Sequence, residues 1–180
     1  MQVKETEIRG LYTIALDVHQ DERGNFREVW QIEKLIDLGL PSITPVQLNV
    51  AESVRGVTRG IHAEPWQKYL HVAYGYVFAA IVDIREDSDT FAKVLTFEMN
   101  NSNALLIPLG CANSYQILSE NAAYSYLVTD HWKPNQKYMA ISLNDQDLNI
   151  PWPIGKEQQI ISTKDAKNPQ IRNLFPNKYH

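Results

Sequence analysis

Two cations, an imidazole and a carboxylate lie within ten residues of the chain, at Arg59, His62, Glu64 and Lys68. Free histidine titrates near neutrality, so His62 is a candidate general base. An ammonium group such as that of Lys68 can stabilise the charge of a developing oxyanion if it faces the same cavity. The segment is therefore a candidate catalytic site. The alternative is a polar edge strand whose groups make ordinary hydrogen bonds.

A metal site can be tested by counting ligands. Zinc, iron and manganese sites in small β-barrels need about three or four His or carboxylate groups, typically with two histidines facing the same way from one strand. His62 and Glu64 share a strand face, but no second histidine lies at that spacing. His71 is nine residues further on, an odd offset that points to the opposite face of an uninterrupted strand. The ligand count predicts a protein without a metal ion.

Three further places carry groups that could do chemistry. The aromatics Tyr124, Tyr126 and Trp132 are candidates either for ordinary sheet packing or for a phenol acid and a stacking surface. Arg23, at a predicted turn, is either free to bind phosphate or part of a solvated hairpin tip. Asp165 follows a short β-prone stretch, and this position by itself is weak evidence for a functional site.

The elements that must position these residues are strands. The run 69–84 is rich in Val, Ile, Tyr and Phe and is interrupted at Tyr74 and Gly75, which predicts two strands joined by a tight turn in a hairpin. Both faces of the second strand are apolar, so it belongs inside a sandwich or barrel. Further β-rich runs separated by turn residues predict an all-β domain, and they are 93–99, 104–107, 114–118, 123–129 and 138–143.

Helical periodicity is scarce. Ile32, Leu35, Ile36 and Leu38 predict one short amphipathic helix closed by Gly39. After residue 151 the chain is polar and poor in strands, which predicts loops and short helices that wrap the domain.

Composition bounds the class of protein. The 180 residues are 44% hydrophobic and 21% charged, which is typical of one globular domain, here residues 1–180. A net charge of -4 argues against nucleic acid or an anionic membrane as the main partner. A single cysteine, Cys111, excludes an internal disulfide and fits a reducing compartment, so we expect a cytoplasmic protein. Residues 1–9 match neither a signal peptide nor a membrane anchor.

The order and spacing of several motifs resemble the dTDP-4-dehydrorhamnose 3,5-epimerase family over nearly the whole chain. These motifs are DERGNF at 21–26, VQLN at 46–49, RGIHAEPWQKY at 59–69, VDIR at 82–85, SDTF at 88–91, IPLGCAN at 107–113, YLVTD at 126–130 and ISTKD at 161–165. The resemblance implies an all-β, cupin-like double-stranded β-helix, that is a jelly-roll barrel, with a few short peripheral helices. It also implies a cytoplasmic homodimer that acts without metal or cofactor.

The resemblance also implies roles for individual residues. His62 would be the catalytic base, Asp165 the carboxylate that orients it, Tyr126 the opposing acid, and Lys68 the cation at the sugar's keto oxygen. Residues that would line the substrate and diphosphate pocket are Gln47, Asn49, Arg59, Asn113 and Trp132. Residues that would reach the nucleotide bound to the neighbouring subunit are Arg23, Phe26 and Glu28.

Two of these positions depart from the pattern of many members. Asn113 stands where they carry a histidine, and it keeps hydrogen-bonding ability but takes no positive charge near pH 7. Trp132 stands where they carry a tyrosine, and it can stack but has no phenol. We therefore expect that sugar or base preference can differ from theirs.

The implied reaction is epimerisation of a nucleotide-linked 4-keto-6-deoxy sugar at C3 and C5. It converts dTDP-4-dehydro-6-deoxy-D-glucose to dTDP-4-dehydro-L-rhamnose in L-rhamnose biosynthesis. The carbonyl acidifies both C–H bonds, so inversion needs a base on one face, an acid on the other and a cation for the enolate. Two alternatives remain open: an enzyme that inverts one centre or isomerises the keto sugar, and a barrel that binds a nucleotide sugar without catalysis.

Overall fold

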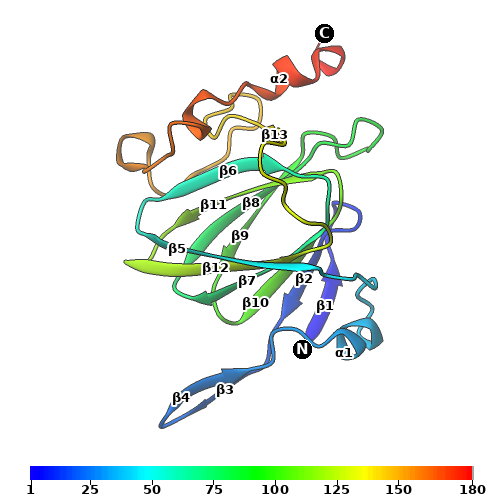
Figure 1. Cartoon of the computed structure of the whole chain (residues 1–180), viewed down its shortest axis with the longest axis vertical. Helices are drawn as coiled ribbons and strands as arrows, with labels where there is room; N and C mark the ends of the chain where they lie inside the picture. Colours follow the sequence, from blue (N-terminus) through cyan, green and yellow to red (C-terminus); the bar gives the residue numbers. More distant parts are fainter. Residues whose placement is uncertain (180) are drawn as a thin grey trace.

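Two antiparallel sheets face each other in the computed structural model, which describes residues 1–179 (Figure 1). Within these residues the first sheet has six strands, in the order β1 (Gln2–Glu5), β2 (Tyr12–Ala15), β10 (Asn103–Ile107), β7 (Lys68–Tyr74), β12 (Asn121–Val128) and β5 (Gln47–Val54). The same part of the chain forms a second sheet of five strands, in the order β13 (Met139–Ala140), β6 (Thr58–Ala63), β11 (Cys111–Ile117), β8 (Val77–Asp83) and β9 (Val94–Met99).

The main core lies between the two sheets. Alternate residues of each strand point inward, so Leu70 and Val72 on β7 share one apolar cluster with Ala79 and Ile81 on β8. Burial of each such Leu or Ile side chain stabilises the fold by about 1.5–3 kcal/mol. This core confirms the predicted pair of packed sheets.

The inward-facing rows become polar at one end of the barrel. On β12, Val128 lies opposite Gln47 of β5 on one side and Lys68 of β7 on the other. The next inward residue of β12, Tyr126, lies opposite Asn49 of β5. The polar side chains at the ends of these strands are therefore brought to one end of the barrel by antiparallel register.

The predicted hairpin in 69–84 is wrong in one respect. The turn at Gly75, with φ +90°, does join β7 to β8. The two strands do not pair, however, because β7 lies between β10 and β12 in one sheet and β8 lies between β11 and β9 in the other. The turn is thus a corner between layers, which gives each strand two backbone partners and an apolar environment on both faces.

The predicted helix is α1 (Ile32–Asp37), and Leu38 and Gly39 follow its end. Its buried residue, Leu35, packs with Ile14 and Leu106 on the outer side of the six-stranded sheet. A two-stranded hairpin, β3 (Val18–Asp21) and β4 (Gly24–Arg27), projects from the body at the end remote from the C-terminus (Figure 1). The turn predicted at Arg23 is therefore the tip of this hairpin.

The C-terminal part of the chain lies along the outer side of the five-stranded sheet, near β6 (Figure 1). It contains the short helices η1 (Lys156–Gln158), η2 (Asp165–Lys167), α2 (Ile171–Leu174) and η3 (Pro176–Lys178), which confirms the predicted loops and short helices. Ile171 and Phe175 pack there against Phe78 of β8 and its neighbours. This apolar contact holds η2 beside β6.

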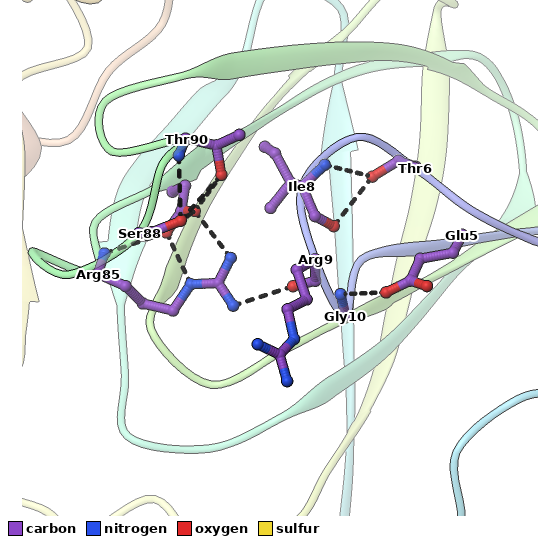
Figure 2. A network of polar contacts seen from close by, with 9 residues as sticks. Glu5, Thr6, Ile8, Arg9, Gly10, Arg85, Ser88 and Thr90 are labelled. Carbon is purple, nitrogen blue, oxygen red and sulfur yellow. Dashed lines mark hydrogen bonds and ion pairs between the residues drawn. The ribbon is translucent and has the colours of Figure 1, made fainter.

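A buried carboxylate fixes the loop after β8. Asp83 is fully buried and accepts hydrogen bonds from Arg85 Nε and Nη2 at 2.8 and 2.7 Å, and from the hydroxyls of Ser88 and Thr90 at 2.6 Å each. Arg85 also donates to the backbone oxygen of Arg9 at 2.9 Å, which links this loop to the N-terminal turn (Figure 2). The VDIR and SDTF motifs are thus one structural network.

Candidate active site

His62 and Asp165 form a hydrogen-bonded pair at the edge of the second sheet. His62 is on β6, and Asp165 begins η2. Nε2 of His62 lies 2.8 Å from Oδ1 of Asp165, and the two side chains are 35% and 6% exposed. Two further groups hold the aspartate: the backbone N–H of Gly60 reaches its Oδ2 at 3.5 Å, and its own N–H donates to Ser162 Oγ at 3.0 Å.

The aspartate is charged at neutral pH. Burial by itself would raise the pKa of Asp165, but the hydrogen bond and charge of His62, with Gly60 and Ser162, bring that pKa below its usual value. An ionised carboxylate only accepts hydrogen bonds, so the network assigns the proton to Nε2 of the imidazole. Nδ1 is then the nitrogen left to accept a proton.

Lys68, the first residue of β7, is buried with a side chain 8% exposed. Its Nζ donates to Oε2 of Glu64 at 2.5 Å and also to Oδ1 of Asn113. Burial lowers the pKa of Lys68, and the nearby Glu64 carboxylate opposes this effect. Asn113 in turn donates to the hydroxyl of Tyr124 at 3.3 Å, which locks the amide so that its oxygen faces the ammonium.

Asn113 joins the two halves of the site. It lies opposite His62 in the pairing of β11 with β6, and its side chain contacts Lys68 from β7 in the other sheet. Tyr126 of β12 completes this end of the barrel, with its ring centroid 5.7 Å from Nζ of Lys68. Burial, and then the charge of Glu64, raise the pKa of Tyr126, with a smaller opposing effect of Arg59. Its phenol is therefore protonated at neutral pH and can donate a proton.

The predicted pocket residues fall in two groups. Gln47 donates to Asn49 at 2.8 Å and accepts from the backbone N–H of Trp132 at 3.0 Å, so these three residues are in one place. Arg59 is exposed on β6 and donates to Ser53 of β5 at 3.2 Å, across the gap between the two sheets. Arg59 also lines a cavity of about 420 Å³ together with His62, Ser162, Lys164 and Asp165, whereas Gln47, Asn49 and Trp132 do not line it.

The hairpin residues lie away from this site within the same chain. Arg23 forms an ion pair with Asp21, Glu28 forms one with Lys34, and Phe26 is 71% exposed on β4. The arrangement leaves these side chains at the surface. Their predicted contact with a neighbouring subunit stays a prediction.

The sequence does not predict the contact that Glu64 makes in the structure. The sequence predicted only that it shares a face with His62, whereas its carboxylate contacts Lys68 four positions further along the chain. Its charge and its proximity to Lys68 in RGIHAEPWQKY were the available signal. Tyr124, considered beside Tyr126, is fully inside the core and stacks on Tyr115 with ring centroids 3.7 Å apart.

Residues 1–179 contain neither a cluster of metal ligands nor a membrane-spanning helix. No group of three or more His, Cys, Asp or Glu side chains in that range is placed to hold a metal ion. No helix of the described chain is long and apolar enough to cross a membrane.

A two-sheet barrel that carries a His–Asp pair, a buried lysine and a protonated tyrosine at one end defines a cupin-like enzyme built for acid–base chemistry. A family model described as dTDP-4-dehydrorhamnose 3,5-epimerase matches residues 5–173. The chain belongs to this family.

Individual relatives agree with this assignment. The RmlC homolog of Streptococcus pyogenes is 39% identical over 96% of this chain and 90% of the relative. The structure of RmlC from Streptococcus suis with dTDP-D-xylose superimposes with a TM-score of 0.90 at 36% identity, over 96% of this chain and 92% of the other. The structure of the Legionella pneumophila dTDP-6-deoxy-D-glucose-3,5-epimerase with dTDP-4-keto-L-rhamnose superimposes with a TM-score of 0.88 at 32% identity. The match covers 98% of this chain and 95% of the other. These findings confirm the predicted family, the cupin-like all-β fold and an epimerase as the class of enzyme.

Proposed function

We propose that the chain converts dTDP-4-dehydro-6-deoxy-D-glucose to dTDP-4-dehydro-L-rhamnose by inverting C3 and C5. The observation that carries the proposal is the His62–Asp165 pair at 2.8 Å, beside a barrel end that also holds Lys68 and Tyr126. The matching family model and the ligand named with the Legionella relative support this choice of substrate.

His62 is the base in this proposal. Its free ring nitrogen takes the proton from the carbon beside the ketone, and the C–H electron pair moves into the enolate. The imidazole then becomes an imidazolium, whose charge is matched by the buried Asp165 carboxylate 2.8 Å away. A positioned general base of this kind contributes about 10²- to 10⁴-fold in rate.

Lys68 stabilises the enolate. Negative charge develops on the keto oxygen when the C–H bond breaks, and a buried ammonium interacts with it more strongly than one in water. Removal of one such donor from an active site typically costs about 10²- to 10³-fold in rate. The burial of Lys68 at 8% exposure suits this role.

Tyr126 returns a proton to the opposite face of the carbon. Its raised pKa keeps the phenol protonated until the enolate forms, and the phenolate that results is then reprotonated from solvent. The His62 imidazolium releases its proton to solvent before the second inversion. The same two steps then act at the other carbon, and the sugar's own ketone supplies the activation each time.

We propose that Gln47, Asn49, Arg59, Asn113 and Trp132 bind the sugar and the diphosphate. Arg59 is the exposed cation next to His62, and Lys164 lines the same cavity. A guanidinium can bind phosphate oxygens through two parallel hydrogen bonds, which suits the diphosphate.

We propose a homodimer in which Arg23, Phe26 and Glu28 contact the nucleotide held by the neighbouring copy. Arg23 and Phe26 lie on the hairpin that projects from the body of the protein, and Glu28 follows directly after its second strand (Figure 1). A second feature supports association: the outer face of β5 exposes Leu48, Val50 and Val54 at 59%, 57% and 51%. Glu52 is exposed on the same face between Val50 and Val54. Exposed apolar residues grouped on one face are typical of contact surfaces.

The oligomer can be tested by sedimentation velocity. Leu48→Lys places a charge in this stripe and should lower the dimer fraction at a given concentration, whereas Thr96→Lys, on an exposed position of β9, should leave it unchanged. A wild-type protein that sediments as a monomer at micromolar concentration would contradict the proposed dimer.

Proton NMR of dTDP-4-keto-6-deoxyglucose in D₂O tests the activity itself. We expect deuterium at both C3 and C5, together with formation of the L-rhamno product. Exchange at one position only would indicate a single-centre epimerase. Binding of dTDP without exchange would indicate a non-catalytic barrel and overturn the proposal.

A further inference from the structure

The three N–H donors of the Lys68 ammonium are not equivalent. Two of them are used within the described residues, one toward the Glu64 carboxylate at 2.5 Å and one toward the Asn113 amide oxygen. An ammonium group has three donors and no acceptor, so one N–H is left to point elsewhere. The ring of Tyr126 also lies next to the ammonium, with its centroid 5.7 Å from Nζ.

Both partners of the ammonium are largely shielded from solvent, and Asn113 has a further partner. The Asn113 amide donates to Tyr124 at 3.3 Å, and Tyr124 is 1% exposed and stacks on Tyr115. The Glu64 side chain is 17% exposed and follows directly after β6, the strand that carries His62. The direction of the third N–H is therefore set by side chains that have little freedom to move.

We propose that Glu64 is the positioning residue of the site: with Asn113 it aims the third N–H of Lys68 at the substrate's keto oxygen, and its charge keeps the buried ammonium protonated. The inference rests on the proposed function of Lys68. In this proposal the Glu64 carboxylate acts through Lys68 and touches no reacting atom itself.

The charges around Lys68 support this assignment to Glu64. Arg59 and His62 lie on β6, and Tyr124 and Tyr126 lie on β12. Burial raises the pKa of both phenols, so neither provides negative charge at neutral pH. Asn113 is neutral, and within residues 1–179 Glu64 is the group whose charge opposes the desolvation of Lys68.

The test uses Glu64→Gln, which keeps the size and an acceptor oxygen but removes the charge. We expect kcat to fall about 10- to 100-fold with KM nearly unchanged, less than the roughly 10²- to 10³-fold loss when a donor is removed outright. The lysine must be protonated to act, so the alkaline limb of the kcat profile should move to lower pH in the variant. Glu98→Gln is the matched control, because Glu98 is an exposed carboxylate on β9 remote from Lys68.

A second measurement does not depend on turnover. Heteronuclear NMR of the Lys68 side chain in the intact protein should show that it titrates at lower pH in Glu64→Gln than in wild type or Glu98→Gln. An unchanged Lys68 titration, or an unchanged kcat profile in Glu64→Gln, would overturn the role of Glu64. Absence of exchange in the wild type would instead overturn the proposed function, so the two failures are distinct.

Discussion

The side chains of His62 and Asp165 meet at 2.8 Å although 103 positions separate them in the sequence. The contact depends on a parallel bridge between Val57 and Ile160 that places the C-terminal segment beside β6. The backbone N–H of Thr58 donates to Ile160 O at 3.0 Å, and the N–H of Ile160 donates to Gly56 O at 2.9 Å. The C-terminal region thus supplies half of the proposed catalytic pair.

His62→Ala should abolish turnover and leave the fold intact, because the imidazole is 35% exposed and contributes little to the core. Solvent deuterium incorporation at C3 and C5 measures the loss, and circular dichroism checks the fold. His131→Ala is the matched control, since His131 is exposed. Complete exchange in the His62 variant would rule out its role as sole base.

Tyr126→Phe should retain exchange better than net inversion. The enolate still forms in this variant, because His62 and Lys68 are intact, but it is reprotonated from the face that lost the proton. The ratio of deuterium incorporation to product formation, followed by NMR, should therefore rise. Equal loss of both would remove Tyr126 from the role of acid.

Asp165→Asn should lower kcat by about 10²-fold or more with a smaller change in KM, since the imidazolium loses its counter-charge and the tautomer is no longer fixed. Asp147→Asn is a suitable control, because it removes a carboxylate paired with Arg172 remote from the site. Steady-state kinetics separate kcat from KM. A variant as active as the control would show that the pair is only structural.

Asp83→Asn should destabilise the fold by about 1.5–3 kcal/mol, because it removes the buried charge that accepts hydrogen bonds from the partly exposed Arg85 and from two hydroxyls. Urea unfolding at pH 7 gives the free energy of unfolding. Asp37→Asn provides a surface control of the same charge change, since Asp37 is exposed. A loss below about 1 kcal/mol would contradict this account of the network.

The same carboxylate predicts a pH dependence. Burial opposes ionisation of Asp83, but hydrogen bonds from Arg85, Ser88 and Thr90 outweigh it and lower the pKa from 3.8 to about 2. A lowered pKa means that the native state binds the proton less readily than the unfolded chain. The resulting stabilisation is present above pH 4 and is lost as the pH falls toward 2. The stability difference between wild type and Asp83→Asn should shrink over that window.

Much of the fold follows from local pattern. The apolar run at 77–83, the β-rich run at 114–118 and the Ile32, Leu35 and Leu38 spacing each predict an element that the structure contains, because side-chain direction depends only on neighbouring backbone. The turn at Gly75 shows the limit. The sequence indicates where the chain turns, but whether the strands pair or separate into two sheets depends on partners such as β10 and β11, which are remote in the chain.

The site, like the fold, depends partly on the sequence and partly on the tertiary structure. The chain itself determined which chemical groups are available: an imidazole, a lysine and a carboxylate in 59–69, and a phenol and another carboxylate further on. The tertiary structure decided which carboxylate serves which cation, pairing Asp165 with His62 and Glu64 with Lys68. The physical reason is that hydrogen bonds and charge interactions depend on distances of a few ångströms, and these distances are fixed by sheet register and by packing of the C-terminal segment rather than by spacing along the chain.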